Sequence, residues 1–113
     1  MFLEYIDNKI QGLKTEEVQL KNSYRKDEAN LTKVKINICE ICKTLYNVSQ
    51  KEPNGQKARE FYLQKLDKLS SEWKASLDIA KEYGDIEKTI IEDIKLEVLH
   101  ELKCKYLSFD MVS

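Results

Sequence analysis

Residues that break helices are scarce in this sequence. Its 113 residues include one proline and three glycines. Proline and glycine are the main punctuation between secondary-structure elements, so a chain with so few of them has few places to turn. Charge is abundant instead, at 35% of residues, and is carried mainly by the good helix formers lysine and glutamate. The sequence therefore predicts an all-α fold made of long helices.

Two further absences narrow the function. The formal net charge is −1, and neither half of the chain has the basic excess that binding to phosphates requires. No apolar run approaches the roughly 20 residues of a membrane span, and the N-terminus lacks a charged segment followed by an apolar core. We expect a single cytoplasmic domain, residues 1–113, with neither a nucleic acid nor a membrane as partner.

A long apolar stripe dominates the N-terminal half. Its members recur at spacings of three and four, which is the pattern of one helix face in a coiled coil. They are Leu3, Ile6, Ile10, Leu13, Leu20, Tyr24, Leu31, Val34, Ile38, Ile41, Leu45 and Val48. Only Glu17 and Asp27 interrupt the stripe; such polar residues either fix the register of a bundle or lie where the stripe is partly solvated. The pattern predicts one helix from about residue 2 to about residue 50.

Two turn signals divide the rest of the chain. Pro53-Asn-Gly55 marks a turn over residues 51–55, and Gly84-Asp85 combines a helix stop with an N-cap. The remaining predicted elements are helices at about 56–83 and about 86–107 and a loose tail at 108–113. If Gly84 only kinks the chain, the fold is an antiparallel helical hairpin; if the chain reverses there, it is a three-helix bundle. The later part of the first helix has an apolar face too broad for one neighbour, which favours the bundle.

Matching the helix lengths leaves the start of the first helix uncovered, because the helix at 56–83 reaches back only to about residue 23. The uncovered residues are Leu3, Ile6, Ile10, Leu13 and Leu20. An exposed apolar stripe of this size is typical of an interaction surface. We therefore expect a non-enzymatic interaction or assembly module whose protein partner is a second copy or a different helical chain. The alternative is that the chain bends back at Gly12 or at Asn22-Ser23.

Three cysteines and a single histidine allow a metal-binding alternative. The odd number argues against a disulfide framework and for reduced thiols in a reducing compartment. Cys39 with Cys42, and His100 with Cys104, each share a helix face, so a chain reversal near residue 84 could unite them in a zinc site. Glu97 with His100 also has the spacing of a di-iron ligand pair. The plainer interpretation is that the cysteines fill small spaces in a helical core.

The C-terminal segment Tyr106-Leu-Ser-Phe-Asp110 resembles the Tyr-x-x-x-Asp/Glu tail of the WXG100 group, which are small helical-hairpin proteins exported by type VII secretion systems. The length and the helical character agree with that group. This chain departs from the pattern at its turn, which is Pro53-Asn-Gly55 in place of Trp-x-Gly, and its tryptophan lies inside a predicted helix. The resemblance implies a small exported hairpin protein as a third alternative.

No catalytic pattern is visible in the sequence. It has one histidine, no glycine-rich phosphate loop and no nucleophile elbow. The acidic and amide side chains lie on mixed-charge helix faces, where solvation explains them. We expect no enzyme activity, no cofactor and no small-molecule substrate.

Overall fold

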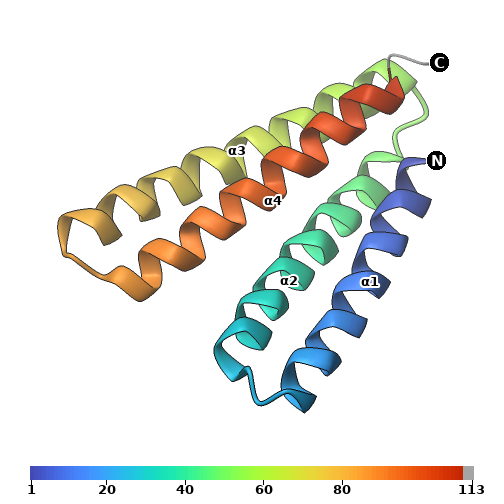
Figure 1. The fold of residues 1–113 in the computed structure, drawn as a ribbon. Helices are drawn as coiled ribbons and strands as arrows, with labels where there is room; N and C mark the ends of the chain where they lie inside the picture. The colour runs from blue at the N-terminus through green and yellow to red at the C-terminus, as the bar shows by residue number, and fades with distance from the viewer. Residues whose placement is uncertain (111–113) are drawn as a thin grey trace.

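Four helices make up the fold. The computed structural model describes residues 1–110. Its helices are α1 (Phe2–Asn22), α2 (Lys26–Ser49), α3 (Gly55–Glu82) and α4 (Ile86–Asp110). α1 and α2 form one helical hairpin, and α3 and α4 form a second (Figure 1). The all-α bundle predicted from the sequence is confirmed, with four helices where two or three were expected.

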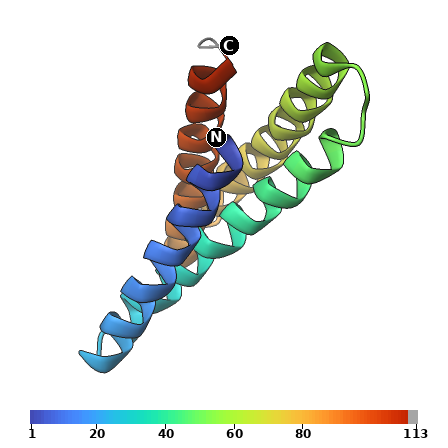
Figure 2. The same cartoon turned by 90° about the vertical axis from the view of Figure 1, so that its right-hand side faces the viewer.

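The two hairpins meet at one end and diverge at the other. The N-terminus, the end of α4 and the loop between α2 and α3 lie at the joined end, whereas the two hairpin turns lie apart at the open end (Figures 1 and 2). α2 and α4 are the central helices, since each packs on its neighbour within its own hairpin and on both helices of the other. The molecule measures 46 × 35 × 21 Å, which makes it about two helix diameters deep.

The predicted single helix over residues 2–50 is wrong, because the chain reverses at residues 23–25. α1 ends in a Schellman motif: Tyr24 has φ 59°, and the N–H of Arg25 donates to the carbonyl of Leu20 at 2.9 Å. α2 then begins at Lys26. Neither glycine nor proline marks this turn, so the stripe of apolar residues passes through it without a visible break.

The second hairpin turns in the same way. Gly84 has φ 66°, and the N–H of Asp85 donates to the carbonyl of Ala80 at 2.9 Å. The Asp85 side chain then caps α4 by accepting from the N–H of Lys88 at 3.1 Å. The chain therefore reverses at Gly84. α4 continues to Asp110, so residues 108–110 are helical instead of a tail, and the predicted tail residues 111–113 lie outside the described residues.

Strong local signals define the start of α3. The Asn54 side chain accepts hydrogen bonds from the N–H groups of Gln56 at 3.0 Å and of Lys57 at 3.1 Å. This is the N-cap arrangement that satisfies the free donors of a helix N-terminus. The helix begins at Gly55, at the end of the predicted turn.

The two hairpins repeat the same contacts at positions 60 residues apart in the sequence. Asp7 on α1 pairs with Lys43 on α2 at 2.6 Å, and Asp67 on α3 pairs with Lys103 on α4 at the same distance. The two hairpin turns share the Schellman motif described above. Each hairpin is thus a version of the same structural unit, although few of the paired residues are identical.

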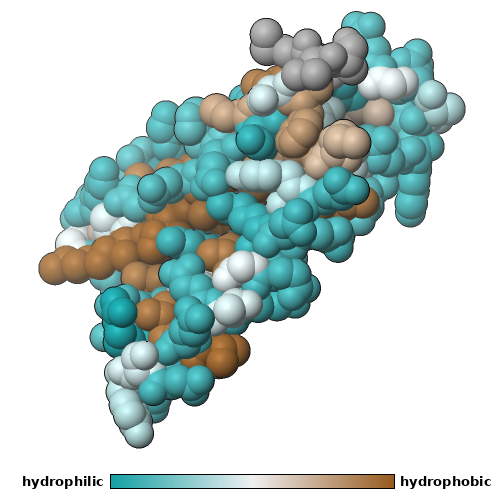
Figure 3. Space-filling model, turned by 45° about the vertical axis from the view of Figure 1, so that its right-hand side comes forward, coloured by the Kyte–Doolittle hydropathy of each residue, from teal (hydrophilic) through white to brown (hydrophobic). Residues whose placement is uncertain are grey.

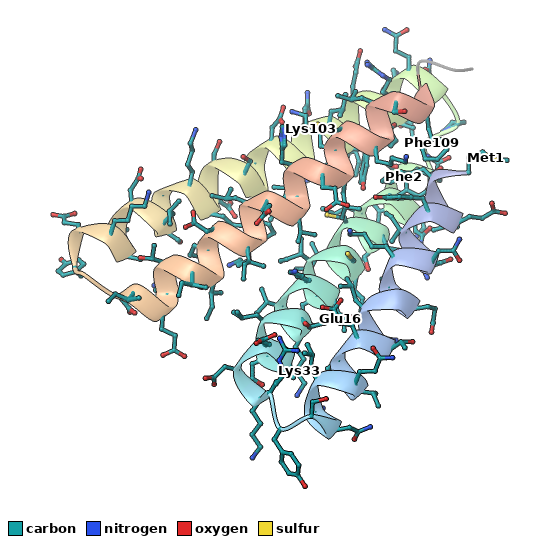
Figure 4. All side chains as sticks on the ribbon, viewed as in Figure 1. Met1, Phe2, Glu16, Lys33, Lys103 and Phe109 are labelled. Carbon is teal, nitrogen blue, oxygen red and sulfur yellow. The ribbon has the colours of Figure 1, made fainter. Side chains whose placement is uncertain are left out.

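An aromatic cluster holds the joined end together. The rings of Phe2 and Tyr46 lie 5.3 Å apart in the first hairpin, and those of Tyr62 and Tyr106 lie 4.7 Å apart in the second. These two pairs are also 60 residues apart in the sequence. Contacts between the hairpins complete the cluster, with Phe2 5.2 Å from Tyr106 and 6.3 Å from Phe109 (Figure 4). Edge-to-face contacts of this kind add to the stabilisation that burial alone provides.

The core continues from the cluster along the seam between α2 and α4. Its central residues are fully or almost fully buried, and they are Ile38, Cys39, Cys42, Val98, Leu99 and Leu102. Toward their separate turns the two helices diverge (Figure 1). The apolar stripe of α2 continues there with Val34 and Leu31, which are only half-buried.

Candidate partner-binding groove

The predicted partner-binding stripe of α1 does not lie at the surface. Ile6, Ile10 and Leu20 are buried, and Leu3 and Leu13 are half-buried. The cause is the turn at residues 23–25, which lays α1 back on α2 so that the chain covers its own stripe. The expectation that these five residues are exposed is therefore wrong, and a partner reaches them only if the first hairpin opens.

Exposed apolar surface lies instead in a groove between α2 and α4 at the open end. The mouth of the groove has a volume of about 570 Å3 and is lined by Asp27, Asn30, Leu31, Val34, Ile86, Glu87, Ile90 and Ile91. An inner part of about 320 Å3 is lined by Val34, Asn37, Ile38, Ile41, Trp73, Ile91 and Lys95. Figure 3 shows hydrophobic surface between the two hairpins. We call the two parts together the interhelical groove.

Several residues in the walls of the interhelical groove are left exposed by the neighbouring helices. Ile86 is 76% exposed, Ile90 is 45% exposed and Ile41 is 39% exposed. Isolated exposed apolar residues are ordinary, but a contiguous set that lines one hollow is typical of an interaction site. The set exists because α2 and α4 separate while their apolar stripes continue.

Two carboxylates stand at the mouth of the groove. Asp27 lies in the first turn of α2 and Glu87 in the first turn of α4, where the helix dipole stabilises a negative charge. They occupy equivalent positions in the two hairpins. Among the described residues that line the mouth, these are the ionisable side chains, so its local charge is negative.

The inner part of the groove is different in character. The Lys95 ammonium lies 3.1 Å from Glu92 Oε1 and 4.8 Å from the centre of the Trp73 ring. Its positive charge is therefore already engaged by a carboxylate and by an aromatic face. Glu92 is buried, and within the described part of the chain its second oxygen, Oε2, has no hydrogen-bond partner.

A charged cluster fastens α1 to α4 away from the groove. Glu101 accepts from Lys9 Nζ at 2.7 Å and from the Tyr5 hydroxyl at 3.2 Å. The hydrogen bond from Lys9 is the main reason that the pKa of Glu101 lies below its usual value. Burial and the neighbouring Glu101 charge raise the pKa of Tyr5. The cluster is thus an ion pair between α1 and α4 to which the Tyr5 hydroxyl adds a hydrogen bond.

The four residues of the predicted zinc site are not brought together. Cys39 and Cys42 are buried on α2, whereas His100 and Cys104 are exposed on α4, with Nε2 and Sγ 3.5 Å apart. Over residues 1–110, no three His, Cys, Asp or Glu side chains gather closely enough to hold a metal ion. Glu97 is likewise exposed, and over the same residues no metal-holding group of three such side chains forms around Glu97 and His100.

The buried cysteines have a structural role. Burial raises the pKa of the Cys39 thiol to about 11 and that of the Cys42 thiol to about 12, so both are neutral at ordinary pH. The Tyr62 hydroxyl donates to the Cys42 carbonyl at 3.0 Å, which joins α3 to α2. These contacts agree with the interpretation that the cysteines fill small spaces in the core.

The segment that resembles a secretion tail forms the last turns of α4. Tyr106 is buried there, and its ring lies 4.7 Å from that of Tyr62. Packing in the aromatic cluster therefore accounts for this tyrosine. The fold also has two hairpins where the resemblance implies one.

Comparison with protein-family models, with curated proteins and with solved structures finds no match to this chain. Within residues 1–110, none of the helices combines the length and the apolar character that crossing a membrane requires. The groove is accordingly interpreted from its own geometry and chemistry.

Sequence reasoning found the groove residues but assigned them to the core. Leu31 and Val34 belong to the first apolar stripe, and Ile90 and Ile91 are apolar residues of the predicted helix at 86–107. The usable signal was the pair of adjacent isoleucines, because neighbouring residues on a helix point about 100° apart and a narrow stripe does not hold both. Asp27 was also visible as a polar interruption of the stripe, and it lies at the mouth.

Proposed function

We propose that this chain is a helix-binding interaction module and that its partner-binding surface is the interhelical groove. The observation that carries the proposal is the exposure of apolar side chains along both walls, including Ile41, Ile86 and Ile90. Burying apolar surface contributes about 25 cal/mol per Å2, so a helix laid between the walls is stabilised by covering them. Recognition of an amphipathic helix by an apolar groove is a common mode of protein binding.

The module acts by packing, without a catalytic step. Its strongest polar clusters join helices of the same chain, as the bond from Lys9 to Glu101 does between α1 and α4. The buried thiols of Cys39 and Cys42 are held neutral. These groups stabilise the helix packing that positions the groove walls. This supports a role in binding over an enzymatic role.

A selection experiment tests this function. A library of displayed amphipathic helices is selected on the wild-type protein, with the soluble variant Leu31→Asp, Ile91→Asp in excess as competitor. We expect helices to be enriched that bind wild type and not the variant, because both new carboxylates lie in the walls. Val18→Asp is the matched control, since Val18 is 56% exposed on α1 and does not line the groove. If no helix is enriched, or if the variant binds equally, the groove is not the binding surface.

Light scattering of the purified chain over a range of concentrations separates two kinds of partner. A dimer that Leu31→Asp dissociates means that the groove of one copy binds another copy. A monomer means that the helix comes from a different chain. Both results agree with an interaction module, whereas a dimer that groove substitutions leave intact would place self-association elsewhere on the surface.

A further inference from the structure

The repeat of equivalent positions in the two hairpins gives the interhelical groove two similar walls. Leu31 on α2 has Ile91 as its equivalent on α4, and both line the mouth. A ligand between the walls therefore meets apolar side chains on two flanks at once. A helix with a narrow apolar stripe covers only one wall, whereas a helix whose apolar arc spans about half of its circumference covers both.

The length of the walls fits a short helix. The apolar residues of α2 that line the groove run from Leu31 to Ile41. At 1.5 Å per residue these positions span about 15 Å, which is roughly three helical turns. A ligand helix thus presents anchors at i, i+3 or i+4 and i+7 on each flank.

The charge of the groove is uneven along its length. Asp27 and Glu87 stand at the mouth, while the cation of the inner part, Lys95, is paired with Glu92 and lies over Trp73. A ligand that is cationic where it emerges at the mouth gains two attractive contacts, and an anionic ligand meets two like charges.

We propose that the interhelical groove binds a basic amphipathic helix of another polypeptide, apolar on both flanks, with lysine or arginine at the end that emerges between Asp27 and Glu87. The inference rests on the proposed function and adds the chemistry of the partner. Its support is charge complementarity at the mouth together with the continuation of the apolar seam between α2 and α4 beyond the core.

A second copy of this chain is a poorer occupant. Outside the groove, the exposed apolar residues that a second copy offers are scattered over both hairpin tips and the joined end. They include Val18, Tyr24, Val48, Ile79 and Tyr83. Scattered residues do not form the broad apolar arc that covers both walls of the groove.

Two synthetic peptides test the inference with a built-in probe. Both are 18-residue helices with the same apolar flanks and without tryptophan, and they differ only in carrying lysine or glutamate at both ends. The chain has one tryptophan, Trp73, and it lines the inner part of the groove, so its fluorescence reports binding. We expect the lysine peptide to bind about tenfold more tightly than the glutamate peptide, since each ion pair at such a site contributes modestly.

Charge variants show whether the mouth is responsible for the preference. Asp27→Lys with Glu87→Lys is expected to reverse the preference between the two peptides. Asp27→Asn with Glu87→Gln is expected to abolish it, and this milder variant keeps the test valid if the reversal perturbs the helix N-termini. Glu4→Lys with Glu60→Lys, at exposed positions outside the groove, is the matched control and should leave the preference unchanged.

The outcomes separate this inference from the proposed function. If both peptides bind equally and Leu31→Asp abolishes that binding, the partner is not required to be basic, but the proposal of a helix-binding groove is retained. A dimer that Leu31→Asp dissociates also overturns the inference of a basic partner, because the occupant is then a second copy. Three results together overturn both the inference and the proposed function: neither peptide binds, the protein stays monomeric, and the library selection enriches no groove-dependent helix.

Discussion

At the scale of the residue, Tyr24 shows how a turn can form without the residue that turns prefer. Its φ of 59° lies in the left-handed region, where a side chain with a Cβ is strained, and its side chain is 94% exposed. The equivalent turn uses Gly84 at φ 66°. The two hairpins therefore adopt the same backbone at different conformational cost.

Exchanging the residue types at the two turns is expected to change stability in opposite directions. Tyr24→Gly should raise the free energy of unfolding by up to about 1 kcal/mol, because glycine adopts this conformation without strain. Gly84→Ala should lower it by about 1 kcal/mol; an added Cβ meets no atom within 4 Å there, so the cost is that of the backbone alone. Urea unfolding of both variants measures these changes. A Tyr24→Gly variant that is less stable would show that the exposed ring makes a contact outweighing the strain.

At the scale of the element, the polar contact between α1 and α4 is centred on one carboxylate. Glu101 accepts hydrogen bonds from Lys9 and Tyr5, and its pKa is lowered chiefly by the hydrogen bond from Lys9. A group with a lowered folded-state pKa stabilises the fold above its unfolded-state pKa. That stabilisation is lost as the pH falls through the lowered value.

Glu101→Gln should therefore reduce stability in a pH-dependent way. We expect a loss of about 0.5 kcal/mol at pH 7, a small value because the Glu101 side chain is 49% exposed. The difference from wild type should shrink toward zero as the pH falls through the acidic range in which Glu101 itself becomes protonated. Urea unfolding at a series of pH values measures it, with the exposed Glu97→Gln on the same helix as control. A difference that stays constant down to low pH would mean that the charge of Glu101 is not the cause.

The elements were predictable where the sequence carries turn chemistry and unpredictable where it does not. Asn54 and Asp85 cap the starts of α3 and α4, and Gly84 marks the end of α3. The turn at Tyr24 has neither glycine nor a capping side chain, and tertiary packing of α1 on α2 offsets the strain of the residue. It lies beside Asn22-Ser23, so the alternative of a bend there is the one that the structure confirms. The missed turn then moved the candidate site, since a straight first helix exposes Ile6 and Ile10 and a folded one buries them.

At the scale of the whole molecule, the two hairpins are held together by the α2–α4 seam and by the aromatic cluster. Leu102 and Cys42 are completely buried in that seam, and Tyr62 in the cluster is completely buried as well. The loop between α2 and α3 adds only a short covalent link. Association of the hairpins should therefore survive the loss of that link.

A protease site inserted between Glu52 and Pro53 tests this organisation. After cleavage, the two hairpins are expected to remain together with the mass of the intact protein, measured by light scattering, because their shared core is untouched. The same cleavage in a Leu102→Asp variant should give separate or unfolded fragments, since an unpaired charge then replaces a core side chain. Separation of the wild-type halves at micromolar concentration would contradict a dominant role for the seam.

The three-residue hairpin turns have a consequence for folding speed. Each turn brings two helices together by closing a very short stretch of chain, so packing within a hairpin can begin beside the turn and spread away from it. Chains dominated by such local contacts fold in microseconds to milliseconds. Both hairpins can form independently and early, and docking of α2 on α4 remains as the step that joins distant parts of the sequence. The interhelical groove lies at the end of that seam, so it takes its shape only when folding is complete.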